Sequence, residues 1–312
     1  MNTILKHFKI MAIAACVTTL FSIQACSDEV LIDDLAKGKA MNDFFVKNKP
    51  VSKKFTLTLS TTGAVDTLKL GSGYALIVSP GTFLINGVAA TGTLNVSATL
   101  IDTKADMVTG RVSTYGDSGN VLQSSGMLNL NVSQNNVQAT IAPAKPLSIQ
   151  VPMKGDIKND FRTFVGGSNG TDSSNWLIDN KSQTIPKSQS YIIKTTKLKW
   201  INCDRFYNNS SNVKFDVKVP AGFTNANASV FVIFMNDHSM CRLFGNASTQ
   251  TFDFGKYPGI PLSTVVKIVV VSSEGDQLKF AEKDYTGATG TVTITSMTNT
   301  TEADLKTFLN GL

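Results

Sequence analysis

The sequence predicts an all-β protein made of two β-sandwich domains that follow a lipoprotein signal peptide, with a short C-terminal helix. Two observations favour β structure: apolar and polar residues alternate over many short segments, and Gly-, Pro- and Asn-containing turns separate these segments. Segments long enough to be the crossover helices of a parallel sheet are missing, which excludes doubly wound folds. The chain has 312 residues, which is enough for two domains. A hydrophobic content of 42% excludes a disordered chain.

Residues 1–25 have the features of a secretory signal peptide. Lys6 and Lys9 precede an apolar run of about a dozen residues, which is shorter than the roughly 20 that span a bilayer. The run is followed by Ile23-Gln-Ala-Cys26, which resembles the lipobox of bacterial lipoproteins. This resemblance implies cleavage before Cys26 and its acylation, so that the chain's partner is a membrane that several acyl chains hold firmly. The alternative is ordinary cleavage that leaves Cys26 as a free thiol.

The residues after Cys26 form a tether, which we assign to 26–54. Ser27, Asp28 and Glu29 resemble the surface-export signal of Bacteroidota lipoproteins, which implies an outer-membrane protein that faces outward. The alternative is that the two acidic residues are solvated tether charges. A short helix is expected over 33–47, with its apolar residues on one side: Leu35, Met41, Phe44 and Phe45.

The first β-sandwich domain is expected over residues 55–152. Apolar residues alternate with polar ones over 55–60, 93–100 and 128–132, which is typical of half-buried strands. Turn-forming sequences such as Gly71-Ser-Gly73 separate these strands and indicate a sandwich or a barrel.

A polar, glycine-rich stretch over 153–185 is interpreted as a linker, and a second β-sandwich domain is expected over 186–312. Residues 213–219 alternate, whereas 230–234 and 265–271 are continuously apolar, as in strands buried on both faces. The chain ends in a predicted helix, which Thr301 and Asp304 would cap.

Several motifs resemble the ZU5-like or immunoglobulin-like β-sandwich module of uncharacterised Bacteroidota lipoproteins. They are Gly81-Thr-Phe-Leu-Ile-Asn86, Thr103-Lys-Ala-Asp-Met107, Ser125-Gly-Met-Leu128 and the proline-rich 142–152. The segment 198–207, Leu-Lys-Trp-Ile-Asn-Cys-Asp-Arg-Phe-Tyr, resembles one that follows that module, with Lys199 in place of a glycine. The resemblance implies the fold and the location, and it brings no established activity.

The charge of the chain favours no nucleic-acid partner. Without Lys6 and Lys9 the formal net charge falls from +6 to +4, and the remaining lysines are scattered instead of forming a basic stripe.

Cys203 and Cys241 are candidates for a disulfide in an oxidising compartment. The alternative is two buried free thiols.

Candidate catalytic chemistry is sparse. His238 is the single histidine outside the signal peptide, so multi-histidine zinc sites are excluded. Carboxylates in turn-like segments could serve glycoside hydrolysis, although such residues more often make backbone hydrogen bonds: Asp102, Asp106, Asp156, Asp160, Asp237, Glu274 and Asp276. We assign no catalytic residue, no metal site and no cofactor.

Three further groups of residues were singled out. Five aromatic residues are candidates for a glycan-stacking surface, with core packing as the alternative: Trp176, Tyr191, Trp200, Tyr207 and Tyr257. Thr67 lies in Asp66-Thr-Leu68, which resembles the short O-glycosylation sequence of Bacteroidota. Asp204 and Arg205 form a charged pair among aromatic residues, and we expect Arg205 to bind a carboxylate at the domain junction in a bidentate way.

These observations predict an outer-membrane, surface-exposed lipoprotein with a non-enzymatic binding or envelope-structural role. One alternative is a glycan-binding accessory lipoprotein of a polysaccharide-uptake system, which requires exposed aromatic residues on one face. The other is a carboxylate-based glycoside hydrolase, which requires two acidic side chains in one cleft.

Overall fold

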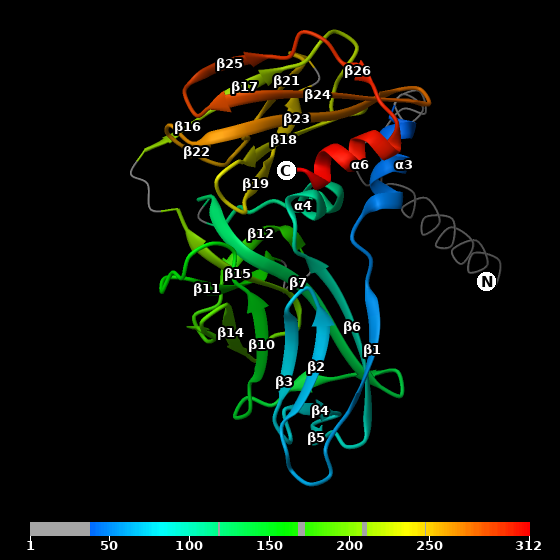
Figure 1. The fold of residues 1–312 in the computed structure, drawn as a ribbon, viewed down its shortest axis with the longest axis vertical. Helices are drawn as coiled ribbons and strands as arrows, with labels where there is room; N and C mark the ends of the chain where they lie inside the picture. Colours follow the sequence, from blue (N-terminus) through cyan, green and yellow to red (C-terminus); the bar gives the residue numbers. More distant parts are fainter. Residues whose placement is uncertain (1–37, 118, 168–171, 208–210, 247) are drawn as a thin grey trace, which may run out of the picture.

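The computed structural model describes residues 38–117, 119–167, 172–207, 211–246 and 248–312. These residues form mainly antiparallel sheets, with one parallel pair of β17 (Phe215–Lys218) and β25 (Gly290–Thr293), and a few short helices, so the predicted all-β sandwich fold is confirmed (Figure 1). Cys26, Ser27, Asp28 and Glu29, with the whole predicted signal peptide, lie outside the described residues. Within them, no helix combines the length and the apolar character that crossing a bilayer requires.

The first sandwich packs two sheets around a shared apolar core that includes Leu94, Leu128, Ile149 and Ile193. Its first sheet has the order β1-β6-β7-β15-β11-β12, with β8 paired to β7: Lys53–Thr58, Thr93–Ile101, Leu122–Gln134, Lys199–Phe206, Arg162–Gly166, Asp172–Ile178 and, for β8, Val137–Gln138. Its second sheet has the order β13-β14-β10-β3-β2: Gln183–Pro186, Ser190–Thr195, Leu147–Pro152, Tyr74–Val78 and Asp66–Gly71. A small sheet of β5 (Val88–Ala89), β4 (Phe83–Ile85) and β9 (Thr140–Ile141) lies at one end (Figure 1).

The second sandwich has its own core, with Phe215, Val230, Phe252 and Ile268 among its residues. One sheet has the order β19-β18-β23-β24-β26: Met240–Arg242, Ala228–Phe234, Val265–Glu274, Gln277–Thr286 and Thr298–Asn299. The other has the order β20-β21-β17-β25: Phe244–Asn246, Thr251–Asp253, Phe215–Lys218 and Gly290–Thr293. A short pair joins β16 (Asn212–Val213) to β22 (Ile260–Pro261).

The sheet pairing places the domain boundary later than the sequence analysis did. Residues 153–185 are not a linker, because they contain β11, β12 and the start of β13, which pair within the first sandwich. The next strands, β14 and β15, pair with β10 and β7, so the second sandwich starts at β16 and not at residue 186. The stretch is polar in composition, and β12 and β13 are edge strands of their sheets, where polar residues are common.

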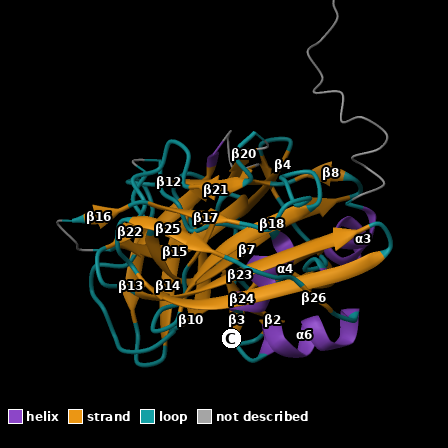
Figure 2. Cartoon of the chain, turned by 90° about the horizontal axis from the view of Figure 1, so that it is seen from above, coloured by secondary structure: helices purple, strands orange, loops and turns teal. Residues whose placement is uncertain are grey.

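A third apolar cluster joins the two sandwiches, and we call it the interdomain cluster. Its buried members come from both domains and from all three described helices: Met41, Phe44, Phe45, Ile101, Ala105, Met107, Val108, Val112, Leu122, Met127, Phe164, Trp176, Phe231, Ile233, Met240, Val269, Val271, Leu278, Leu305 and Leu309. Figure 2 shows the helices gathered beside the long β23 and β24 strands. The two domains therefore share a continuous apolar interior.

The helices belong to this junction and not to a loose tether. The predicted N-terminal helix is present as α3, Lys39–Asn48, and its Met41, Phe44 and Phe45 are buried in the cluster, whereas Leu35 lies outside the described residues. The predicted C-terminal helix is α6, Glu302–Asn310, and Thr301 Oγ1 accepts a hydrogen bond from Asp304 N at 3.1 Å.

Helix α4, Lys104–Gly110, contains most of the motif Thr103-Lys-Ala-Asp-Met107. A capping box of Thr103 and Asp106 starts it, and this signal is visible in the sequence. At its C-terminal end the Arg111 guanidinium lies 4.1 Å from the centroid of the Phe45 ring, which joins α4 to α3.

Truncation of a central residue of the interdomain cluster tests whether the two sandwiches unfold together. Phe231 is fully buried and its ring contacts that of Phe45. We expect Phe231→Ala to lower the free energy of unfolding by about 3–5 kcal/mol, in a single denaturation transition followed by tryptophan fluorescence and circular dichroism. Val88→Ala, at a 70% exposed position, is the control and should change it by less than about 0.5 kcal/mol. Two separate transitions in the wild-type protein would contradict this coupling.

Candidate ligand pocket between the two domains

A pocket of about 360 Å³ opens where the two sandwiches meet. The first domain contributes Lys104 at the start of α4, Gln123 of β7, the 154–158 loop after β10, and Arg205 of β15; Phe161 also lines it. The second domain contributes the turn between β18 and β19, residues 235–238. Both domains are therefore needed to form the pocket.

Backbone hydrogen bonds hold the turn of the second domain against the first domain. Ser124 N donates to His238 O at 3.1 Å, and Thr114 N donates to Met240 O at 2.9 Å. The buried Ser239 hydroxyl donates to Leu122 O at 2.8 Å. These bonds fix the position of His238 relative to the first domain.

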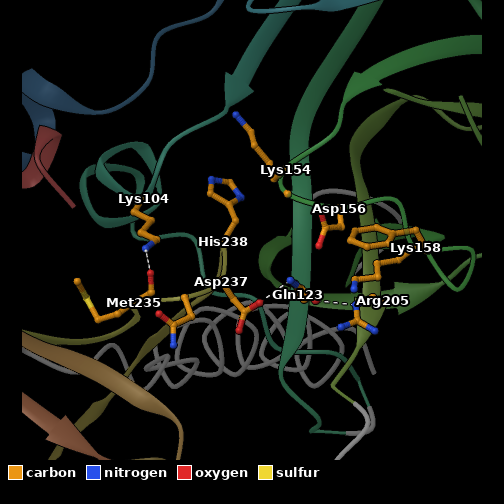
Figure 3. Close-up of a pocket in the computed structure, with 12 residues that line it drawn as sticks. Lys104, Gln123, Lys154, Asp156, Lys158, Arg205, Met235, Asp237 and His238 are labelled. Carbon is orange, nitrogen blue, oxygen red and sulfur yellow. Dashed lines mark hydrogen bonds between the residues drawn. The ribbon is translucent and has the colours of Figure 1, made fainter. Parts of the chain in front are cut away.

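Figure 3 shows Lys104, Lys154 and His238 toward one end of the pocket. Lys104 Nζ donates to Met235 O at 3.0 Å, and Lys154 Nζ lies 2.8 Å from Asp102 Oδ1. Burial lowers the pKa of the half-buried Lys104. Burial, with the positive charge of Lys154, lowers the pKa of His238 to about 4. The imidazole is therefore neutral at pH 7, between two ammonium groups.

The other end of the pocket carries charges of both signs. Arg205 Nε donates to Gln123 Oε1 at 2.6 Å, and Gln123 Nε2 donates to Asp237 Oδ1 at 2.5 Å, which links the two domains (Figure 3). Arg205 Nη1 also donates to Asp160 at 3.1 Å. Arg205 thus binds a carboxylate, but not in the bidentate way expected, because its Nε is used by Gln123 and a single guanidinium nitrogen, Nη1, contacts Asp160.

The predicted aromatic residues do not form one exposed surface. Trp176, Tyr191 and Tyr257 are buried in three different clusters, and Trp200 and Tyr207 are half-buried. Aromatic side chains pack well in protein cores as well as on binding surfaces, and three of these five are buried in apolar cores. Tyr191 has another role: its hydroxyl bonds both N and O of Lys158, each at 3.1 Å, and so positions the pocket loop.

Cys203 and Cys241 are buried free thiols and not a disulfide. They lie in separate interiors, Cys203 in the core of the first sandwich and Cys241 in that of the second. Burial raises the pKa of Cys241 to about 12, so this thiol is unreactive at neutral pH.

Most of the candidate carboxylates have structural partners. Asp106 caps α4, Asp102 pairs with Lys154, Asp160 with Arg205, Glu274 with Lys279 and Asp276 with Lys39. Asp156 and Asp237 are the two acidic residues that line the pocket. Thr67 is exposed on β2, an edge strand, which is a position open to modification. No group of metal-ligating side chains occurs among the residues that the structure describes.

Asp204 lies next to this region and is fully buried. It faces Ser124 and Asn202 beside a bulge between β7 and β15, and Asn202 Nδ2 donates to its Oδ2 at 2.5 Å. Burial raises the pKa of its carboxyl well above the ordinary value. No basic side chain forms an ion pair with Asp204 in the described part of the chain. The sequence indicates that Asp204 lies among aromatic residues, but it does not show that this residue is buried without a cation.

Comparisons with known proteins add no family. No protein-family model matches the chain, and no curated protein matches it.

Replacement of Asp204 by asparagine tests its buried neutral state. A raised carboxyl pKa means that the folded state loses stability as the pH rises above about 4, where the unfolded carboxyl ionises, by at most about 1.4 kcal/mol per pH unit. We expect Asp204→Asn to be more stable than the wild type at pH 7, with a difference that vanishes near pH 4 in urea denaturation. The exposed Asp216→Asn is the control. A variant whose loss of stability grows as the pH rises would show that the charged carboxylate is required.

Proposed function

We propose that the protein is a lipid-anchored protein of the outer membrane, exposed at the cell surface, with a non-enzymatic binding role. The lipobox-like Ile23-Gln-Ala-Cys26 and the acidic residues after it support the anchor and the location. The observation that carries the binding role is the interdomain pocket, because its polar walls come from two domains that a shared apolar cluster holds together. Such junctions are common sites for small ligands.

The proposed anchor lies close in sequence to a helix that packs in the interdomain cluster. Helix α3 begins at Lys39, soon after the proposed acylated Cys26, and its apolar face is buried in the interdomain cluster. The junction of the two domains would therefore be the part of the body that the tether holds. A purely structural role in the envelope would use the same anchor but would not require the pocket.

Loss of the acylated cysteine tests the anchor. We expect Cys26→Ala to abolish incorporation of labelled palmitate and to move the protein from the membrane fraction to the soluble fraction, because no acyl chain remains to enter the bilayer. Cys203→Ala is the matched control and should keep both the label and the location, because Cys203 is buried. Labelling that survives Cys26→Ala would contradict the assignment.

Protease treatment of intact cells tests the outward orientation. We expect the wild-type protein to be cleaved on whole cells and the double variant Asp28→Ala/Glu29→Ala to be protected until the outer membrane is broken. The double variant Asp33→Ala/Asp34→Ala removes the same charge farther along the tether and should behave as the wild type. Protection of the wild-type protein on whole cells, with cleavage of the purified protein, would show that it faces the periplasm.

A further inference from the structure

The cationic end of the interdomain pocket contains polar groups that the described protein leaves incompletely satisfied. Lys104 is half-buried, and the hydrogen bond of its ammonium goes to a backbone carbonyl and not to a carboxylate. Lys154 has one carboxylate partner, Asp102, and an ammonium offers three donors. Because burial of a charge is costly unless the charge is paired, this end of the pocket favours an anionic group.

His238 supplies a second, independent observation at the same end. Both of its ring nitrogens are shielded from solvent; the Ser124 backbone is the one protein group that lies close enough to raise the pKa of the ring by hydrogen bonding, so at least one nitrogen has no partner among the described residues. A neutral imidazole has one donor and one acceptor, and an unsatisfied buried polar group costs about 1–3 kcal/mol. A ligand hydroxyl, which both donates and accepts, satisfies either nitrogen.

The opposite end suits hydroxyl groups. Asp156 and Asp237 line it together with Lys158 and Arg205, so it offers both acceptors and donors of hydrogen bonds. The Gln123 amide and the Arg205 guanidinium lie beside them, joined by a 2.6 Å hydrogen bond. A hydroxyl both donates and accepts hydrogen bonds, so hydroxyls suit this end of mixed charge, whereas Lys104 and Lys154 make the first end suited to an anionic group.

On these grounds we propose that the pocket binds a saccharide that carries a carboxylate, a uronic acid, with the carboxylate between Lys104 and Lys154. Its hydroxyls then reach His238 and the acidic side chains at the opposite end. This inference rests on the proposed binding role of the pocket and names the class of ligand. The volume of about 360 Å³ lies within the range of small-molecule sites.

The imidazole of His238 is a built-in probe for this test. The chain has two histidines, so the variant His7→Gln leaves His238 as the single imidazole in the NMR spectrum. Four probes are compared. Glucuronate and glucose are a matched pair, because glucuronate has a carboxylate where glucose has a hydroxymethyl group. Acetate and inorganic sulfate are anions without the sugar. We expect glucuronate to shift the His238 signals in a saturable way, with an affinity at least ten-fold higher than that of the other three.

A charge variant ties the binding to the pocket. Lys104→Gln should weaken glucuronate binding by about ten-fold or more while leaving the thermal unfolding temperature nearly unchanged, and the exposed Lys69→Gln should bind as the wild type. Equal binding of glucose or acetate would overturn the acidic-saccharide inference but would leave the pocket as a ligand site. No response of His238 to any of the four probes would overturn the inference, while the anchor and orientation are tested separately by labelling and protease treatment.

Discussion

The packing of apolar side chains between the two sandwiches is the constraint on which the rest of the structure depends. Each sandwich has its own core, but the pocket needs the β18–β19 turn to stay against β7, and the interdomain cluster on the neighbouring faces keeps it there. Met240 belongs to the cluster and lies two residues after His238, so packing and pocket geometry are linked along the chain. A mobile junction would separate the charged walls of the pocket.

The pocket is polar because of where it lies. Strand ends and turns from both domains lie just outside the apolar cluster. Their backbone groups and charged side chains are not buried by the cluster and line the pocket instead. The bonds from Arg205 to Gln123 and from Gln123 to Asp237 satisfy some of these groups across the junction. Among the pocket residues, Lys104 bonds a backbone carbonyl instead of a carboxylate and His238 has an unsatisfied ring nitrogen, so a ligand would gain from binding beside them.

The sequence was informative where local patterns decide structure. Alternation over 93–100 and 213–219 predicted β6 and β17, and the Thr301 cap predicted α6, because these signals act within a few residues. The domain boundary was misplaced because a polar edge strand such as β12 resembles a linker in composition, and only pairing with distant strands distinguishes the two. The pocket could not be predicted from the sequence either, because contacts between the domains bring Lys104, Lys154 and His238 together.

The most direct test of this account is the distance between the two sandwiches in solution. Spin labels at Val88 of β5 and Leu262 after β22, both exposed, report this distance by double electron–electron resonance in a chain with Cys16 and Cys26 replaced by alanine. The native Cys203 and Cys241 are buried and should not take the label. The account predicts one narrow distance distribution, because the interdomain cluster fixes the domains. A broad or multi-peaked distribution would contradict it and would remove the structural basis of the pocket.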